Sequence, residues 1–316
     1  MKQISLLVIL LSLSIFSFGQ KERTIAFYNV ENLFDTLDTP NKSDSEFLPN
    51  GKKEWNSEKY STKIKHINQV IDAIESPLII GLCEVENKNV VLDIVKNGQL
   101  SCTHAVVHAE SRDQRGIDNA IIYDKSAILL EEKGTIRFNI PGDRPTRDIL
   151  WVRFTARKTS FYVMVNHWPS RYGGSEESEP KRMIAAENAR LFIDSLIQND
   201  PKVRIIFMGD LNDHPENAAP QMIQEQLSPM ITAESGKYQG THNYRGQWGI
   251  LDHIMVSDSF LKKRGTRIVK NSGTIHSFNF LIGEYRGNEV PARTYGGKKY
   301  LNGYSDHLPV SIKIRL

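Results

Sequence analysis

Polar side chains of three kinds cluster at the ends of six short apolar runs in this 316-residue sequence: carboxylates, carboxamides and imidazoles. In chain order the candidates are Asn29, Glu31, Glu84, His167, Asp210, Asn212, Asp252, Asp306 and His307. Carboxylates gathered at one place repel one another, and a bound divalent cation relieves that repulsion. Because the donors include no thiolates, they favour a hard ion, Mg²⁺ or Mn²⁺ first, with Ca²⁺ as a further option.

A plainer interpretation exists for each such residue taken alone, because a polar residue after a strand commonly forms a turn or caps a helix. We prefer that interpretation for Asn32, Glu86, Asn87 and Asp213, and we expect His253 to be a packed or exposed strand residue. Repetition at six strand ends argues that the remaining residues form one site.

The apolar runs themselves predict eight strands, since they are short and rich in β-branched and aromatic residues. They are Thr24–Tyr28, Leu78–Leu82, Ala120–Tyr123, Ile149–Phe154, Phe161–Val165, Val203–Met208, Leu251–Val256 and Val310–Ile314. Short connections predict two antiparallel hairpins. One joins Ala120–Tyr123 to the segment from Ile128, and the other joins Ile149–Phe154 to Phe161–Val165.

Two stretches have helical spacing. Apolar residues recur on one face from Tyr60 to Ile74, with Ser57 at the start and Pro77 after the end. The second stretch runs from Lys181 to Ile197. Strands joined partly by turns and partly by helices indicate an α/β sandwich of two packed mixed sheets with helices outside. Three polar, Gly- and Ser-rich stretches are expected to be long functional loops: Asp35–Trp55, Ser170–Glu179 and Ser272–Gly303.

The N-terminus has the pattern of a secretion signal. Lys2 precedes an apolar run from Ile4 to Phe18, and Ser17 and Gly19 give the small-x-small pattern of a cleavage site after Gly19. The run is shorter than the roughly 20 residues of a membrane span, although an uncleaved anchor is the alternative. We therefore expect residues 1–19 to be a signal peptide and residues 20–316 to be one domain, secreted or periplasmic, without stable membrane insertion.

The composition excludes several classes of protein. With 40 Lys and Arg against 37 Asp and Glu, the chain is no polybasic nucleic-acid binder, so affinity for phosphate must come from a local site. The two cysteines, Cys83 and Cys102, are too few for a disulfide scaffold or a thiolate zinc site. Cys83 is expected to be buried, and whether it pairs with Cys102 is left open. The lack of a Gly-x-Ser-x-Gly elbow argues against a metal-free serine hydrolase.

The order of the motifs resembles the endonuclease/exonuclease/phosphatase superfamily, which includes deoxyribonuclease-I-like nucleases, abasic-site endonucleases, sphingomyelinases and inositol polyphosphate phosphatases. The most specific segments are Gly209-Asp210-Leu211-Asn212 and Ser305-Asp306-His307-Leu308-Pro309-Val310. Three further segments, 28–34, 115–118 and 166–170, are similar to predicted extracellular nucleases. The resemblance runs from Asn29 to His307. It implies a four-layer α/β sandwich with the active site at the top of its two sheets, and metal-dependent hydrolysis of phosphoric esters.

The resemblance also implies roles for the metal ligands and for the attack on phosphorus. Glu84 would be the principal metal ligand, helped by Asn29, with Glu31 and Asp306 as supporting or second-metal ligands. Asp210 and Asn212 would position and deprotonate the attacking water. Whether Asp210 or a histidine is the general base is left open.

The imidazoles and one arginine complete the implied site. His307 would face the phosphate, with Asp252 holding its ring in one tautomer. His167 would be a second imidazole, for which the local pattern offers Asp118 as a hypothetical partner. Arg147 would contact phosphate.

The expected substrate is a nucleic acid, DNA or RNA, cleaved internally by a monomer. Loop cations and aromatics fit phosphate contacts and base stacking: Arg171, Tyr172, Lys181, Arg182, Arg286, Arg293, Tyr295, Lys298, Lys299 and Tyr300. The alternative is a phospholipid-headgroup or small-molecule phosphodiesterase or phosphatase, similar to sphingomyelinases, with Phe278–Ile282 inserted into a lipid surface. A catalytically inactive binding module would lack one of the key residues, and all of them are present.

Two departures bear on the substrate. Asp252-His253-Ile254 stands where inositol phosphatases carry Asp-Arg-Ile, and the tyrosine-bearing segment of the abasic-site enzymes has no clear match. Both branches are therefore disfavoured.

Overall fold

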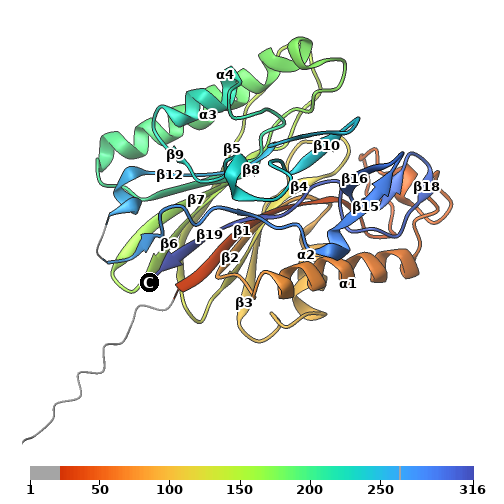
Figure 1. The fold of residues 1–316 in the computed structure, drawn as a ribbon, viewed down its shortest axis with the longest axis horizontal. Helices are drawn as coiled ribbons and strands as arrows, with labels where there is room; N and C mark the ends of the chain where they lie inside the picture. The colour runs from red at the N-terminus through yellow and green to blue at the C-terminus, as the bar shows by residue number, and fades with distance from the viewer. Residues whose placement is uncertain (1–21, 263–264) are drawn as a thin grey trace, which may run out of the picture.

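Two β-sheets pack face to face, with α1 and α2 outside one sheet and α3 and α4 outside the other (Figure 1). The structure, a computed structural model, describes residues 22–262 and 265–316. The arrangement confirms the predicted α/β sandwich. The predicted signal peptide, residues 1–19, lies outside the described residues. None of the helices within the described ranges has the length and apolar character needed to cross a membrane.

The first sheet has the strand order β13-β19-β1-β2-β4-β3, and β14 also pairs with β19. Its strands are β1 (Glu22–Leu33), β2 (Ile79–Val85), β3 (His104–His108), β4 (Asp118–Asp124), β13 (Arg267–Ile268), β14 (Thr274–Ile275) and β19 (Val310–Arg315). β1 runs parallel to β2 and antiparallel to β19. The carboxyl ends of β1 and β2 and the start of β19 therefore share one edge of the sheet.

The second sheet has the order β5-β6-β7-β8-β12-β9. Its strands are β5 (Leu129–Ile136), β6 (Ile149–Ala156), β7 (Thr159–His167), β8 (Ile205–Asp210), β9 (Ser228–Pro229) and β12 (Asp252–Val256). β7 is parallel to β8, and β12 is antiparallel to β8. Here too, the carboxyl ends of two parallel strands lie beside the start of an antiparallel one.

The remaining elements are helices and small hairpins. The α-helices are α1 (Ser57–Ala73), α2 (Lys88–Lys96), α3 (Ser175–Asn199) and α4 (Ala218–Gln224). Short 3₁₀ turns are η1 (Ser45–Phe47), η2 (Ala233–Ser235), η3 (Asp258–Leu261) and η4 (Asn279–Leu281). Three two-stranded hairpins pair β10 (His242–Tyr244) with β11 (Gln247–Gly249), β15 (Ile282–Tyr285) with β16 (Asn288–Pro291), and β17 (Tyr295–Gly296) with β18 (Lys299–Tyr300).

All eight predicted strands are present, and the segment from Ile128 forms β5, whereas β3, β9, β13 and β14 of the two sheets were missed. β5 carries Glu131, Glu132 and Lys133 on an exposed edge, so it lacks the apolar run used to find strands. The predicted hairpin from Ala120–Tyr123 to Ile128 is wrong. Because β2 and β3 already occupy both edges of β4, the chain crosses to the other sheet, where β5 pairs with β6. The β6–β7 hairpin is confirmed.

Alternating side chains build two apolar layers. Ile206 and Met208 of β8 point between the two sheets, whereas Ile205 and Phe207 point toward α3. Burying each such side chain contributes roughly 1.5–3 kcal/mol. The sheets pack closely at Gly81 of β2, where an added Cβ would lie 2.7 Å from the Met208 sulfur. This close packing brings the polar ends of the two sheets together.

Local sequence sets the ends of α1 and α2 as expected. Asn56 caps α1, and its side chain accepts a hydrogen bond from the Lys59 amide. Asn87 caps α2 in the same way, as predicted. Glu86 instead holds the loop that follows β1, because its carboxylate accepts hydrogen bonds from the Asp35 amide and the Thr39 hydroxyl. Cys83 is buried, Cys102 is exposed and both are free thiols.

The predictions for α3 and Asp213 need correction. α3 begins at Ser175, inside the predicted loop Ser170–Glu179, and includes Pro180. Arg182 is fully buried, and its Nε lies 2.8 Å from an oxygen of Asp213, which is itself fully buried. Arg171 contacts the other oxygen of Asp213 at 3.2 Å. Arg182 is therefore no substrate contact, and Asp213 anchors α3 beneath the segment after β8 rather than forming a simple turn.

The segment Phe278–Ile282 packs on the core. Leu281 is buried, while Phe278 and Phe280 stack on each other with ring centroids 5.4 Å apart. Phe280 also contacts the Tyr304 ring at 5.0 Å. The packing gives no support to insertion of this segment into a lipid surface.

Replacing Arg182 with Met should lower the free energy of unfolding by about 3 kcal/mol, because a buried carboxylate loses its closest cation. Lys181→Met, one residue earlier and partly exposed, should change it by less than about 0.5 kcal/mol. Urea denaturation measures both values, and equal effects of the two substitutions would contradict the inferred role of the buried pair.

Candidate active site

Three side chains stand side by side at the end of the second sheet. His167 ends β7, Asp210 ends β8 and Asp252 begins β12, and the strand registers pair His167 with Asp210 and Asp210 with Asp252. Gly209 makes this row possible, because a Cβ there would lie 2.3 Å from the Asn166 carbonyl oxygen. The row therefore follows from β pairing between segments far apart in sequence.

The first sheet contributes Asn29 and Glu84 across from this row. The Asn29 amide donates to Asp210 at 3.0 Å and lies 3.4 Å from Glu84. Glu84 also accepts a hydrogen bond of 2.8 Å from the Asn32 amide. With its nitrogen on both carboxylates, Asn29 holds them together as a donor, so the metal-ligand role predicted for it stays a prediction.

Irregularities in strand pairing orient Glu84 and Glu31, the acidic site residues of the first sheet. The β2–β4 register shifts between Cys83 and Val85, and Glu84, at the shift, has a φ of 61°. The β1–β2 register also shifts after Asn29, and Glu31 has a φ of 49°. Left-handed backbone at a non-glycine residue costs about 1–3 kcal/mol and collects at functional sites.

Asp252 controls the charge of His307. The Nδ1 of His307 donates to Asp252 over 2.7 Å, and its Nε2 lies 3.7 Å from Asp210. Burial alone would lower the pKa of His307, but Asp252 and Asp210 outweigh it and raise the pKa well above its ordinary value. Ser305 supports the segment, because its hydroxyl donates to the Asn29 carbonyl and accepts from the His307 amide.

His167 has the opposite electrostatics. Its Nε2 lies 3.8 Å from Glu84 and 3.8 Å from Asp210. Burial and the nearby cations Arg147 and Arg115 lower its pKa well below the ordinary value, so the ring is neutral at pH 7. The site therefore pairs a charged imidazole with a neutral one.

The proposed partner of His167 needs correction. Asp118 lies 3.2 Å from His108 Nε2 and accepts a hydrogen bond from the Ser111 amide. Its place at the start of β4 directs it to the neighbouring strand β3, which carries His108. Within the described residues, the Nδ1 of His167 has no hydrogen-bond partner.

Arg147 and Asn212 both hold the Trp168 carbonyl. Arg147 is buried, donating to that carbonyl at 2.6 Å and to Asp113 at 3.2 Å, and its Nε has no partner within the described residues. The Asn212 side chain donates to the same carbonyl at 3.0 Å, while its amide donates to Asp210 at 2.9 Å. Both residues brace the site, and the Arg147 Nε has no hydrogen-bond partner among the described residues.

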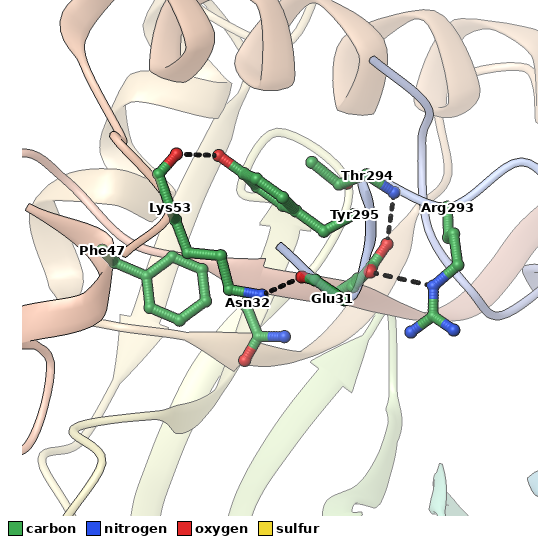
Figure 2. Close-up of a pocket in the computed structure, with 8 residues that line it drawn as sticks. Glu31, Asn32, Phe47, Lys53, Arg293, Thr294 and Tyr295 are labelled. Atoms are coloured by element: carbon green, nitrogen blue, oxygen red, sulfur yellow. Dashed lines mark hydrogen bonds and ion pairs between the residues drawn. The ribbon is translucent and has the colours of Figure 1, made fainter. Parts of the chain in front are cut away.

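Glu31 and Asp306 form a second acidic pair that the chain neutralises itself. Arg293 lies 3.5 Å from Glu31 and donates to Asp306 at 2.9 Å. Figure 2 shows Glu31 held by the Thr294 amide and Arg293, with Lys53 and Phe47 across a small cavity of about 170 Å³. Burial, aided by Asp306, raises the pKa of Glu31 to about 7, against the opposite effect of Lys63 and Arg293.

Lys63 and His242 were missed at the sequence level. Lys63 is buried, and its ammonium donates to the Thr294 hydroxyl and the Tyr304 carbonyl. In the sequence it is one of several lysines on α1, so nothing marks it. The His242 ring packs 4.9 Å from the His307 ring, and His242 is the first residue of the short strand β10, which was not predicted from the sequence.

The donor set fits a divalent cation near Glu84 better than near Glu31. Burial raises the pKa of Asp210 to about 7, and both Asp252 and Glu84 add to this effect. Around Glu84 and Asp210 the described contacts are amides and imidazoles, whereas Arg293 and Lys63 already balance Glu31 and Asp306. A hard cation with oxygen ligands would offset the repulsion between Glu84 and Asp210.

Comparisons with known proteins give one consistent result. The sequence model described as the Endonuclease/Exonuclease/phosphatase family matches residues 24–316. No curated protein sequence matches the chain. Solved structures do match, at a sequence identity that shows the fold alone.

Three of these structures illustrate the likeness. An endonuclease/exonuclease/phosphatase family protein of Bacteroides thetaiotaomicron is 16% identical, with a TM-score of 0.60 over 93% of this chain and 95% of that one. The human Nocturnin catalytic domain with bound sulfate is 15% identical, with a TM-score of 0.58 over 93% and 94%. A mannosyl-6-phosphatase of B. thetaiotaomicron is 15% identical, with a TM-score of 0.59 over 93% and 100%.

Asp252→Asn should lower the pKa of His307, because the ring loses its nearest negative charge. Titration of the imidazole by NMR in metal-free protein measures this. Asp258→Asn, at an exposed carboxylate on η3, serves as the control and should leave the titration unchanged. An unaltered pKa in Asp252→Asn would show that this contact does not set the charge of His307.

Proposed function

Since the chain belongs to the endonuclease/exonuclease/phosphatase family and is a phosphoric-ester hydrolase, we propose that it is a Mg²⁺- or Mn²⁺-dependent nuclease that hydrolyses phosphodiester bonds in DNA or RNA. The observation that carries the proposal is the meeting of Asn29, Glu84, His167, Asp210, Asn212, Asp252 and His307 at one edge of both sheets.

Members of this family depend on a divalent metal, and the groups near Glu84 and Asp210 fit one. A bound cation would neutralise charge on the phosphate and lower the pKa of water. Glu84 is the proposed principal ligand. Glu31 and Asp306 carry their own cations, which supports a single metal rather than two.

Asp210 and His307 have opposite roles in the proposed proton transfers. With a pKa near 7, Asp210 takes a proton from water at neutral pH, and Asn212 fixes its carboxylate through the backbone amide. His307 is protonated, so its Nε2 donates to a phosphate oxygen, and Asp252 holds that charge in place. These opposite charges favour Asp210 over a histidine as the general base.

The reaction is a substitution at phosphorus. The water oxygen forms a bond to phosphorus while its proton passes to Asp210, the bond from phosphorus to the leaving oxygen breaks, and the leaving oxygen takes a proton from protonated His307. Neutral His167 is placed to donate a hydrogen bond to an oxygen of the phosphate from the other side of Asp210. Asp210 thus acts as the proton acceptor, and His307 and His167 act as the two donors, around the position of the scissile phosphate.

A small-molecule phosphatase is the second candidate. The cavity beside Glu31, with Lys53 and Arg293 in its walls, has room for a small anionic group, and one structural neighbour is named as a mannosyl-6-phosphatase. The phospholipid version lacks its expected support, because Phe278 and Phe280 pack on the core.

Export from the cytoplasm is part of the proposal. It rests on the apolar segment Ile4–Phe18 and the small residues Ser17 and Gly19. A secreted or periplasmic nuclease would act on nucleic acid outside the cell. N-terminal sequencing of the exported protein would test it, with Gln20 expected as the first residue.

The purified protein should nick plasmid DNA and cleave RNA in Mg²⁺ or Mn²⁺, and EDTA should abolish both activities. Asp210→Ala and His307→Ala should each lower the rate by a factor of about 10²–10⁴. His276→Gln is the matched control, since this imidazole bonds Ser311 away from the site and should leave the rate unchanged.

Other outcomes separate the alternatives. Hydrolysis of only a sugar phosphate would favour the phosphatase. Hydrolysis of only sphingomyelin would favour the lipid phosphodiesterase. Full activity in EDTA, or in both alanine variants, would overturn the proposed mechanism.

A further inference from the structure

The tripeptide Tyr-Arg-Gly occurs twice in the chain, at 244–246 and 285–287, and each copy forms the tip of a hairpin. Tyr244 pairs with Gln247 across the β10–β11 turn, and Tyr285 pairs with Asn288 across the β15–β16 turn. Arg245 and Arg286 have φ angles of 53° and 52°. The glycines that follow them also have positive φ. Both turns are therefore of the two-residue kind that favours Asn-Gly.

Arginine is a poor choice for this backbone conformation, which asparagine adopts with less strain. The chain nevertheless places arginine there twice. Each guanidinium lies over the ring of the preceding tyrosine, at 5.1 Å for Arg245 and 5.2 Å for Arg286. Tyr244 and Tyr285 are 64% and 61% exposed. Each tip thus presents a cation and a tyrosine side chain that is more than half exposed, which suits a ligand more than the fold.

The two tips lie together beside the active site. A Cβ added to Gly246 would lie 3.4 Å from the Asn288 side chain, and Figure 1 shows β10 next to β16. β10 begins at His242, whose ring packs against His307, and Tyr244 follows two residues later. Because neighbouring side chains of a strand point to opposite faces, Glu284 points away from the face that carries Tyr285. Glu289 is paired with Lys237 at 3.4 Å.

The opposite end of the active site has a basic cleft of about 380 Å³. Arg115, Arg144, Arg147 and Lys181 line it, against two carboxylates, Asp113 and Asp143. The partnerless Nε of buried Arg147 belongs to this lining. Tyr172 stands at its rim and is 93% exposed. Cations and an exposed ring therefore recur at this second place.

The sheet order puts these two surfaces on opposite sides of Asp210. Arg147 precedes β6, whereas Asp252 begins β12 and contacts His307 beside the hairpin tips. From β6 to β12 there are three strand spacings, about 14 Å. A small diester at Asp210 would leave both surfaces empty, and a longer chain of phosphates would reach them.

We propose that a single nucleic-acid strand lies across the site from the basic cleft to the two Tyr-Arg-Gly turns and is cut internally. This rests on the proposed function. Arg245 and Arg286 bind phosphates, and Tyr244, Tyr285 and Tyr172 stack on bases, which are exposed in a single strand. Because the strand is held on both sides of the scissile phosphate, cleavage needs no free end.

The test uses the double variant Arg245→Asn, Arg286→Asn. Asn-Gly suits these turns, so the hairpins should be retained while both cations are removed. Arg157→Asn is the matched control. Arg157 also has a positive φ and lies at the β6–β7 turn, just before Thr159, which is eight residues along β7 from His167, or about 26 Å.

With a single-stranded 20-mer, the double variant should raise KM about tenfold. Hydrolysis of bis-p-nitrophenyl phosphate should be unchanged, and Arg157→Asn should match the parent on both substrates. End-labelled 20-mer should give internal fragments first. Equal reductions in activity on both substrates, an unchanged KM, or release of only terminal nucleotides would overturn the inference.

Binding separates this inference from the proposed function. Fluorescence anisotropy with the same 20-mer in EDTA needs no catalysis. In the double variant, the slope of log K against log salt should become shallower by about 1.4, or 0.7 for each phosphate that an arginine no longer neutralises. A protein that binds in this way but hydrolyses nothing would refute the proposed function alone. An unchanged slope in an active enzyme would refute the inference alone.

Discussion

The burial of Asp210 is the constraint on which the rest of the site depends. Its carboxyl lies at the junction of the two sheets, next to Asp252 in its own sheet and near Glu84 from the other. Removing such a group from water favours its neutral form. The surrounding groups stabilise the charged form of Asp210. The Asn29 side chain and the Asn212 backbone amide donate hydrogen bonds to its carboxylate, and charged His307 lies 3.7 Å away. Each of these contacts also orients a group needed for hydrolysis.

The sandwich produces this junction because both sheets have the same local topology. In each, two parallel strands end beside the start of an antiparallel strand, so polar residues from six chain segments meet at one edge. Bulges then turn Glu84 and Glu31 toward that edge at the cost of left-handed backbone. The strain is acceptable because the flanking strands are fully buried and fix the backbone on either side.

Charge balance differs across the mouth of the site. Arg293 contacts Glu31 and Asp306 directly. Among the described residues, the direct contacts of Glu84 and Asp210 are amides and imidazoles, and Arg147, Lys63 and Arg293 act on Glu84 only over longer distances. This difference favours binding of a metal cation at Glu84 and Asp210 rather than at Glu31 and Asp306. Arg293 lies in the segment 272–303, which was predicted to be a loop but contains the hairpins β15–β16 and β17–β18, and its contacts with Glu31 and Asp306 hold this segment against the sheet edge.

The sequence by itself determined the strands and the chemical types at their ends, because short β-branched runs and the polar residues after them are local signals. It thereby indicated Glu84, Asp210, Asp252 and His307 as one group. Only the tertiary structure decided which residues touch. Asp118 faces His108 because β3 is the neighbour of β4, and β5 joins the other sheet because both edges of β4 are occupied. Buried Lys63 and the Arg182–Asp213 pair look like surface residues in the sequence, since a charged side chain becomes a core residue only when a partner distant in the chain balances it.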